Sequence, residues 1–585
     1  MGRPGAVAES IWLSAGRTET LVCVGALASV TFFSSFAEGL SEAVRWLLGK
    51  DCHVPRAAPV RAGRQLKVAI LGGGLSGSAA ALWLRDAFGD GANIDLVVIC
   101  DGPVGGRCQT LDFADGRYEA GSSTFSDMNP YFVALLRRFS IGRWCMSKLH
   151  LPFGVSDGSH IVFSAVGTAA AGGWSAVARF LTYWRLIWSF GPWSLWKLRG
   201  LGKSAAPFES LGLYRALRDG AAFSHPRELL STVGHDVLRS SERPAGQCLL
   251  RDLRLSRKMV QELVEPGLRA TFAGQGCSEL HALAGLAGIV GRGLCCRQFS
   301  VCGGTGLVPE RALEAARPRV LSGTARLVRK TAGAGPSEPS FEVGYDATVR
   351  GETMKASGPS RPSVSKTAAG EAEGLLVENF HVVLVAHPLE HSVLRFEGCC
   401  GETIGQDGPK LPPFRRSVAH FVHGTLKLQH FFKEGSEDDP VVAPSCVPAY
   451  VWTTANSALP FYAISLQFPV TTRTQAEARK ILASAEQGAP QVYKVLATRQ
   501  LAEQELDEWF DRCSTSPVQI VDWHACPQYG APQSFRPFVL DKAGVLYVSA
   551  MEQVASTMEM SLVGARNVVN LVADWVGQRR GPHGF

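Results

Sequence analysis

One glycine-rich turn constrains this 585-residue chain more than any other feature. The apolar run Lys67–Leu71 predicts a buried strand, residues 78–88 predict a helix, and the turn 72–77 joins them as G-x-G-x-x-G. In that context the glycines permit a tight turn, close backbone approach to a pyrophosphate and close helix–strand packing. The helix N-terminus attracts the phosphates. A merely structural glycine turn is the alternative. The predicted dinucleotide-binding residues here are Gly72, Gly74, Leu75, Ser76 and Gly77.

A second strand is predicted over residues 94–100, and an acid at its end would bind the ribose of the cofactor. Asp101 is the candidate, although it stands one position later than the usual strand-end carboxylate, where this chain has Cys100. A solvated turn residue before Gly102-Pro103 is the competing interpretation of Asp101.

The run Val104-Gly105-Gly106-Arg107 follows directly and resembles the second fingerprint of a flavoprotein superfamily that includes amine oxidases and carotenoid desaturases. Backbone N–H groups of Gly105 and Gly106 are expected to reach the flavin diphosphate, and Arg107 is expected to add a cationic fork there. A nicotinamide-dependent dehydrogenase has no need of this second element. The two fingerprints together therefore predict FAD. The same resemblance implies that Gly121 and Ser122 skirt the flavin ring.

Over most of residues 65–580 the chain resembles the prenylcysteine oxidases, also called prenylcysteine lyases. Apart from the two fingerprints, the resemblance rests on segments spread along the chain. They are Tyr118–Phe125, Glu262–Arg269, Gly303–Val308, Thr453–Ser457, Ser549–Glu552 and Ala555–Ser561. The last two are the most specific, and Ala550 departs from the family's usual glycine. The resemblance implies that Ala325, Glu552 and Met558 also contact FAD.

The implied activity is an FAD-dependent oxidation of S-prenylcysteine by O2 and water, which yields a prenyl aldehyde, free cysteine and hydrogen peroxide. Because the cofactor supplies the chemistry, no catalytic side chain is named. The fourteen histidines are scattered, no metal site is expected, and Tyr529 and Asn456 are guesses for the amino-acid subsite. Another flavin oxidase of the superfamily, an amine oxidase or a polyene desaturase, remains open, as does a non-catalytic membrane-associated descendant.

The expected fold class is α/β, with a Rossmann-type, amine-oxidase-like FAD-binding domain interleaved with a mixed α+β substrate domain. The FAD-binding domain is predicted from residues 65–140, 295–398 and 539–585, with a flexible insertion at about 333–375. The substrate domain takes a helical part, 141–294, and a strand-rich part, 399–538.

Residues 1–64 are predicted to be a leader. The uncharged, apolar stretch 20–37 is short for a membrane span and ends in a cleavage-like Ser35-Phe36-Ala37, which favours a signal peptide over an uncleaved signal anchor. We therefore expect a secretory, endolysosomal or vacuolar lumen as the location, with membrane association through the leader if it is an anchor.

The expected partners are S-prenylcysteine and O2. A net charge of +7 without dense basic blocks gives no indication of nucleic acid binding. Five tryptophans and Tyr183 lie among basic residues between Trp174 and Trp196, which fits either a membrane-surface helix or a helix packed on the core.

Overall fold

The computed structural model describes residues 65–89, 93–149, 151–165, 184–204, 211–291, 297–331, 340–347, 375–404, 413–431 and 448–578. Its contacts divide the chain into Met1–His53 and Val54–Phe585, and all described residues belong to the second unit. The predicted leader, 1–64, lies outside the described residues.

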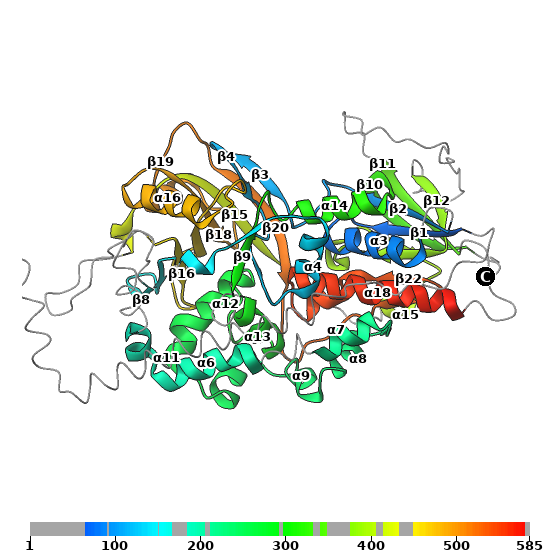
Figure 1. Ribbon diagram of the computed structural model, residues 1–585, viewed down its shortest axis with the longest axis horizontal. Coiled ribbons are helices and arrows are strands. Elements are labelled where there is room, and N and C mark those ends of the chain that lie inside the picture. Colours follow the sequence, from blue (N-terminus) through cyan, green and yellow to red (C-terminus); the bar gives the residue numbers. More distant parts are fainter. Residues whose placement is uncertain are drawn as a thin grey trace, which may run out of the picture. The chain divides into compact units, whose positions relative to one another are not determined.

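A nine-stranded sheet holds the two glycine fingerprints (Figure 1). Strands β10, β2, β1, β13 and β22 are neighbours in that order and pair in parallel, whereas β11, β12 and β21 extend the sheet antiparallel and β14 pairs with β10. The bounds are β1 Leu66–Leu71, β2 Ile94–Cys100, β10 Arg319–Lys330, β11 Phe341–Ala347, β12 Leu376–Phe380, β13 Val382–Val385, β14 Arg395–Glu397, β21 Val539–Asp541 and β22 Val545–Tyr547.

The parallel strands are buried because helices cover them. Helix α3 (Leu75–Phe88) packs against α14 (Leu307–Ala316) and α18 (Met558–Gln578). Its Ala79, Ala80 and Ala81 are fully buried, so small side chains allow this close packing. An all-parallel centre with covered faces is the arrangement that apolar runs such as β1 require. This sheet, together with the second sheet below, confirms the predicted α/β class.

The second, eight-stranded sheet has the order β19-β15-β18-β17-β16-β7-β8, with β20 paired to β15. Its pairings are antiparallel except for β16 with β7. The bounds are β7 Phe153–Ser156, β8 Ile161–Ala165, β15 Phe414–Leu426, β16 Tyr450–Thr453, β17 Phe461–Leu466, β18 Gln491–Ala497, β19 Phe510–Arg512 and β20 Gln519–Pro527. Two small sheets add β3 Thr110–Phe113 with β4 Gly116–Glu119, and β5 Phe125–Ser126 and β6 Arg143–Cys145 on either side of β9 Gln298–Val301.

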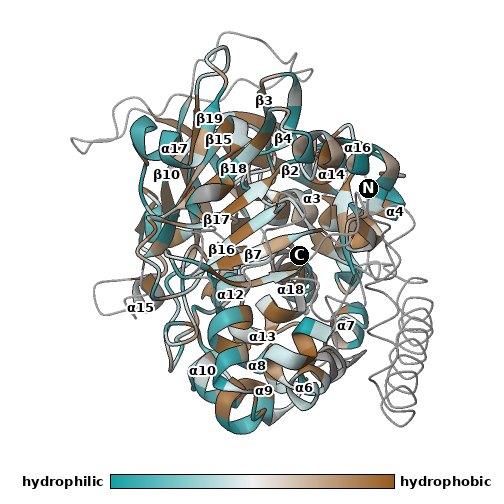
Figure 2. Ribbon diagram, turned by 90° about the vertical axis from the view of Figure 1, so that its left-hand side faces the viewer, coloured by the Kyte–Doolittle hydropathy of each residue, from teal (hydrophilic) through white to brown (hydrophobic). Residues whose placement is uncertain are grey.

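Most of the other helices gather below the eight-stranded sheet and beside α18 (Figures 1 and 2). The bounds are α4 Pro130–Arg138, α6 Pro192–Ser204, α7 Leu211–Arg218, α8 Pro226–Ser231, α9 His235–Arg239, α10 Ala245–Gln247, α11 Arg257–Met259, α12 Glu265–Thr271, α13 Ala282–Gly291, α15 Gly401–Ile404, α16 Gln475–Glu486 and α17 Glu503–Trp509. Short 3-10 or π-helical turns include η3 Cys248–Asp252, η4 Val260–Val264 and η7 Val548–Gln553. None of the described helices is long and apolar enough to cross a bilayer.

Two expectations about these segments need correction. Residues 341–347, predicted as part of a flexible insertion, form β11, in which Phe341 and Val343 are fully buried. Alternating apolar residues pair there with β10 and β12, and this long-range pairing outweighs the loop-like composition around them. The remainder of the insertion, 332–339 and 348–374, lies outside the described residues. The stretch 141–294 is also not helical throughout, because β6, β7 and β8 precede its helices.

Candidate cofactor and substrate site

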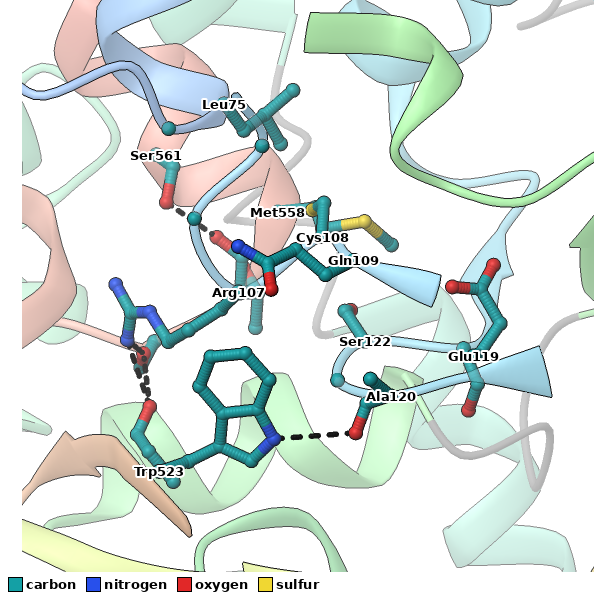
Figure 3. A pocket seen from close by; sticks show the side chains of 18 of the residues that line it. Leu75, Arg107, Cys108, Gln109, Glu119, Ala120, Ser122, Trp523, Met558 and Ser561 are labelled. Atoms are coloured by element: carbon teal, nitrogen blue, oxygen red, sulfur yellow. Dashed lines mark hydrogen bonds between the residues drawn. The ribbon is translucent and has the colours of Figure 1, made fainter. Parts of the chain in front are cut away.

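A cavity of about 1140 Å³ lies where the two large sheets approach one another. The glycine loops after β1 and β2 line one part of it, and residues of β16, β17, β18 and β20 line another (Figure 3). A single cavity therefore joins the predicted dinucleotide loops to the second sheet. Among the residues predicted to bind the cofactor, those that line it are Gly72, Gly74, Leu75, Ser76, Asp101, Gly105, Gly106, Arg107, Gly121, Ser122, Ala325, Glu552 and Met558.

The two glycine loops form one backbone cradle. Gly74 and Gly105 are joined by a parallel β-bridge, and a Cβ on Gly106 would lie 3.2 Å from the Cα of Gly74. Gly74 is also the N-cap of α3, where no side chain caps the helix and no acidic residue stands in the first turn. The free N–H groups of this helix end lie in the cavity wall. A cradle of this kind fits the diphosphate of FAD.

Gly77, in contrast to Gly74, serves the close packing of α3 against the loop that follows β1. It is absent from the cavity lining, and a Cβ at this position would stand 2.1 Å from the carbonyl oxygen of Gly72. A Cβ on Gly74, in contrast, meets no atom closer than 3.9 Å, and its backbone has an ordinary φ of −73°. Gly77 is thus required by the fold, whereas the space above Gly74 is kept open toward the cavity.

Asp101 follows β2 directly and is exposed in the cavity wall. The Cys100 side chain lies below the first loop, 3.4 Å from where a Gly73 Cβ would stand. Burial, followed by the nearby Asp101 carboxylate, raises the pKa of the Cys100 thiol. Both residues line the cavity, and the contact of Asp101 with a cofactor ribose stays a prediction.

Arg107 is bound by residues of β20 and of the C-terminal motif. Its guanidinium donates to the Glu552 carboxylate at 2.6 Å, to the Ala525 carbonyl at 2.8 Å and to the Ser556 hydroxyl at 3.2 Å. Burial alone would lower the pKa of Arg107, but the Glu552 carboxylate outweighs it and raises the pKa. The C-terminal motif thus orients the guanidinium of Arg107 in the cavity wall, and its expected contact with the diphosphate stays a prediction.

Glu552 lies in the cavity wall as the partner of Arg107, and its contact with FAD stays a prediction. The resemblance places it at the flavin edge, and it does line the cavity, but its carboxylate is committed to Arg107. The backbone carbonyl of Glu552 accepts a hydrogen bond from the Tyr529 hydroxyl at 3.0 Å, and that hydroxyl accepts one from the Ser556 N–H at 2.7 Å. Tyr529 is therefore occupied in holding the start of α18. Neither it nor the exposed Asn456 lines the cavity, so the structure gives no support to either guess for the amino-acid subsite.

Buried Glu119 and Lys494 also line the cavity, and sequence reasoning missed both. The Lys494 Nζ donates to the backbone carbonyls of Glu119 at 3.1 Å and Gly121 at 3.4 Å. The Glu119 carboxylate accepts from the N–H and the hydroxyl of Thr305. Burial raises the pKa of Glu119 to about 7 in spite of these bonds. The sequence does contain one sign of this site, because Lys494 is the only charged residue in the otherwise mostly apolar strand β18.

Trp523 reinforces the same turn from β20. Its indole N–H donates to the Ala120 carbonyl at 3.2 Å, as the dashed line in Figure 3 marks. The turn 119–122, which the resemblance places beside the flavin ring, is therefore held by donors from two strands of the second sheet. These bonds fix one wall of the cavity against the other.

Glu559 belongs to the C-terminal motif and is almost completely buried. Its carboxylate accepts the N–H groups of Tyr131 and Phe132 at 2.9 and 3.1 Å, and the Tyr214 hydroxyl at 3.0 Å. It thereby caps the start of α4. Burial nevertheless raises the pKa of Glu559 to about 7.

The far part of the cavity is largely apolar. Phe153 and Trp452, whose ring centroids lie 5.3 Å apart, form one wall, and small residues of α12 and α13 lie in another. The apolar lining residues of this part are Met146, Leu151, Phe153, Ala270, Ala273, Ala287, Gly288, Trp452, Ala463, Leu466, Phe468 and Leu496. Among the described residues, no group of three or more His, Cys, Asp or Glu side chains is placed to hold a metal ion.

The chain is similar to several known proteins. Residues 175–580 match the family model described as prenylcysteine lyase, and residues 70–139 match an NAD(P)-binding Rossmann-like domain. A mouse protein named prenylcysteine oxidase 1-like is 27% identical, with 86% of this chain and 90% of the relative covered. A farnesylcysteine lyase of Arabidopsis thaliana is 26% identical over 86% of this chain and 87% of the relative. A solved structure of a redesigned putrescine oxidase aligns with a TM-score of 0.48 at 12% identity, over 87% of this chain and 99% of that one.

The family model spans well over half of the chain, and it includes the C-terminal motif that binds Arg107. The Rossmann-like match covers the first glycine loop, Asp101 and the second loop. The chain belongs to the prenylcysteine lyase family.

Proposed function

We propose that this protein is an FAD-dependent oxidase that cleaves S-prenylcysteine. The observation that carries the proposal is one cavity that joins a dinucleotide cradle to an apolar, aromatic-walled pocket in a chain of this family. Relatives that bear the names prenylcysteine oxidase and farnesylcysteine lyase support it. Polar and charged residues such as Lys494 and Glu119 also line the cavity, so the family match, and not the polarity of the pocket, favours a thioether over an amine as substrate.

The residues of this chain would hold FAD in place and form the pocket for the substrate. Gly74 and Gly105 would hold the diphosphate of FAD, and the turn 119–122, tied to Lys494 and Trp523, would lie beside the flavin. Bound FAD would accept a hydride from the carbon next to the thioether sulfur. The apolar pocket would take the prenyl chain, whose burial contributes about 0.8 kcal/mol per carbon before ordering costs.

The overall reaction consumes one O2 and one water for each thioether. It forms one prenyl aldehyde, one cysteine thiol and one hydrogen peroxide, so atoms and electrons balance. We expect equal amounts of aldehyde and peroxide from farnesylcysteine under air. Deuterium on the allylic carbon of the prenyl chain, which is bonded to sulfur and gives up the hydride, should slow turnover. Peroxide formed without aldehyde would exclude cleavage of this bond.

We also propose a luminal location in the secretory or endolysosomal pathway, with peripheral contact to a membrane. The apolar, uncharged stretch 20–37 supports the location, and it lies outside the described residues. If the stretch is a cleaved signal peptide, the mature protein from its native cell should begin near Glu38. N-terminal sequencing that finds the leader intact would leave the anchor or a cytosolic chain.

A further inference from the structure

Two neighbouring helical segments expose four tryptophans, which is unusual for so large a side chain. Residues 184–190 are helical and lead into α6. Trp188, Trp193 and Trp196 are 79%, 63% and 61% exposed, and Trp184 is 45% exposed. Exposed clusters of large apolar side chains commonly mark an interaction site. We call the surface of these four side chains the tryptophan surface.

The tryptophans form ordered pairs. The rings of Trp184 and Trp188 are stacked with centroids 6.4 Å apart, and those of Trp193 and Trp196 are stacked at 4.9 Å. The Lys197 Nζ lies 5.5 Å from the Trp193 ring and donates to the Arg254 carbonyl beside α11. Figure 1 shows α6 next to α11. The surface is therefore a set of fixed, flat rings attached to the helical part of the fold.

Charge indicates the kind of partner. Residues 184–198 include two basic residues, Arg185 and Lys197, and no acidic one. Arg185 donates to the Ser164 hydroxyl at 3.4 Å. Tryptophan beside lysine and arginine suits the headgroup zone of a bilayer, and anionic lipids add an attraction for each basic residue.

The opposite side of the same segments leads to the cavity. Phe190 is buried and lies 5.2 Å, centroid to centroid, from Phe163 of β8. Phe163 contacts Phe153 at 5.6 Å, and Phe153 contacts Trp452 at 5.3 Å. Phe153 and Trp452 line the apolar part of the cavity. A continuous series of aromatic rings thus connects the helix that bears Trp188 to the proposed prenyl pocket.

We propose that the tryptophan surface docks on an anionic phospholipid bilayer, and that docking brings the cavity to a prenyl substrate dissolved in that bilayer. The second half of this statement rests on the proposed function, and the first half does not. A farnesyl chain partitions into lipid, so an enzyme that meets it at the bilayer avoids the cost of exposing the chain to water.

Docking is tested with vesicles of phosphatidylcholine and phosphatidylserine whose acyl chains carry bromine, which quenches tryptophan only at close range. The full chain is compared with the triple variant Trp188→Ser, Trp193→Ser, Trp196→Ser. A control variant, Val320→Ser with Ile520→Ser, removes two exposed apolar side chains elsewhere. We expect quenching of the unmodified chain and the control, and its loss in the triple variant. Quenching should weaken on vesicles of phosphatidylcholine alone.

Quenching that is equal in the triple variant and the unmodified chain would overturn the proposal, even if another segment binds the vesicles. Because the three side chains are exposed, the triple variant should keep its thermal midpoint. A dimer that forms without vesicles and that the triple variant dissociates would assign the surface to a second copy of the chain, and would also overturn the proposal.

Whether docking brings the prenyl substrate from the bilayer to the cavity is tested by measuring the rate of thioether cleavage. Farnesylcysteine in anionic vesicles is compared with S-allylcysteine, a short thioether that stays in water. For the triple variant we expect kcat/KM to fall about tenfold with the vesicle substrate and to stay unchanged with the soluble one. An equal fall with both substrates would contradict delivery from the bilayer. Quenching without turnover of either substrate by the unmodified chain would refute the proposed function and leave docking intact.

Discussion

The guanidinium of Arg107 and the carboxylate of Glu552 meet at 2.6 Å although 445 positions separate them in the chain. The pair joins the second glycine fingerprint to the motif before α18. Because both residues line the cavity, this contact closes the cofactor side of the site with groups from opposite ends of the described chain. The order of the C-terminal motif therefore depends on the loop after β2.

We predict that Glu552→Ala lowers stability by about 2 kcal/mol, because Arg107 would lose its charged partner in a confined site. The exposed pair Arg117–Asp112 offers a matched control, since solvent screens this pair and Asp112→Ala should lower stability much less than Glu552→Ala. Thermal unfolding of both variants at equal FAD concentration measures the difference. Equal losses would mean that the Arg107–Glu552 pair is no more than a surface contact.

The glycine loop provides a second prediction. Gly74→Val should leave the fold intact, because no atom lies within 3.9 Å of the new Cβ, but the side chain would stand where the diphosphate must sit. Gly77→Ala should instead destabilise the fold itself, since its Cβ would stand 2.1 Å from the Gly72 carbonyl oxygen. The flavin absorption band and the thermal midpoint of the apoprotein separate the two effects. A Gly74→Val protein that purifies with full flavin would exclude this loop as the cofactor site.

The predictable parts of the fold are local. The glycine spacing located β1, α3 and β2 to within a few residues, because turn, strand and helix signals lie side by side in the sequence. The partner of Arg107 could not be found this way, since Glu552 is brought to it only by the complete sheet. Strand β11 was missed for a similar reason. Its apolar alternation is short, and its strand character depends on pairing with β10 and β12.

The apolar pocket leads to a prediction about substrate length. Ala287→Leu adds three carbons beside α13 in the cavity wall, which should displace part of a prenyl chain. If three carbons of the chain are displaced at about 0.8 kcal/mol each, kcat/KM for farnesylcysteine should fall by about 60-fold. S-allylcysteine should be much less affected, and Ala287→Ser, which keeps the side chain small, should affect neither strongly. A loss as large for S-allylcysteine as for farnesylcysteine would place the prenyl chain elsewhere.

Glu559 should make stability depend on pH. Its folded pKa is raised to about 7, whereas an unfolded glutamate titrates near about 4.3. Between these values the native state holds a proton that the unfolded state releases, so stability should fall as pH rises through this window and level off above about 7. Glu119 acts in the same direction.

The variant Glu559→Gln stays neutral at every pH and should flatten this dependence. The thermal midpoint of the full chain, followed from about pH 5 to about pH 8, provides the measurement. An unchanged slope in the variant would mean that Glu559 is already ionised in the fold at low pH.

The central claim is that one cavity holds FAD next to a prenyl thioether, and anaerobic reduction of the bound flavin tests it most directly. The purified, flavin-loaded protein is mixed without oxygen with farnesylcysteine, spermine or a carotene, and the flavin absorption band is followed. Farnesylcysteine is expected to bleach the band, whereas the other two compounds are not. Bleaching by spermine or a carotene, with none by farnesylcysteine, would exclude a prenyl thioether as the substrate and assign the cavity to a different oxidation.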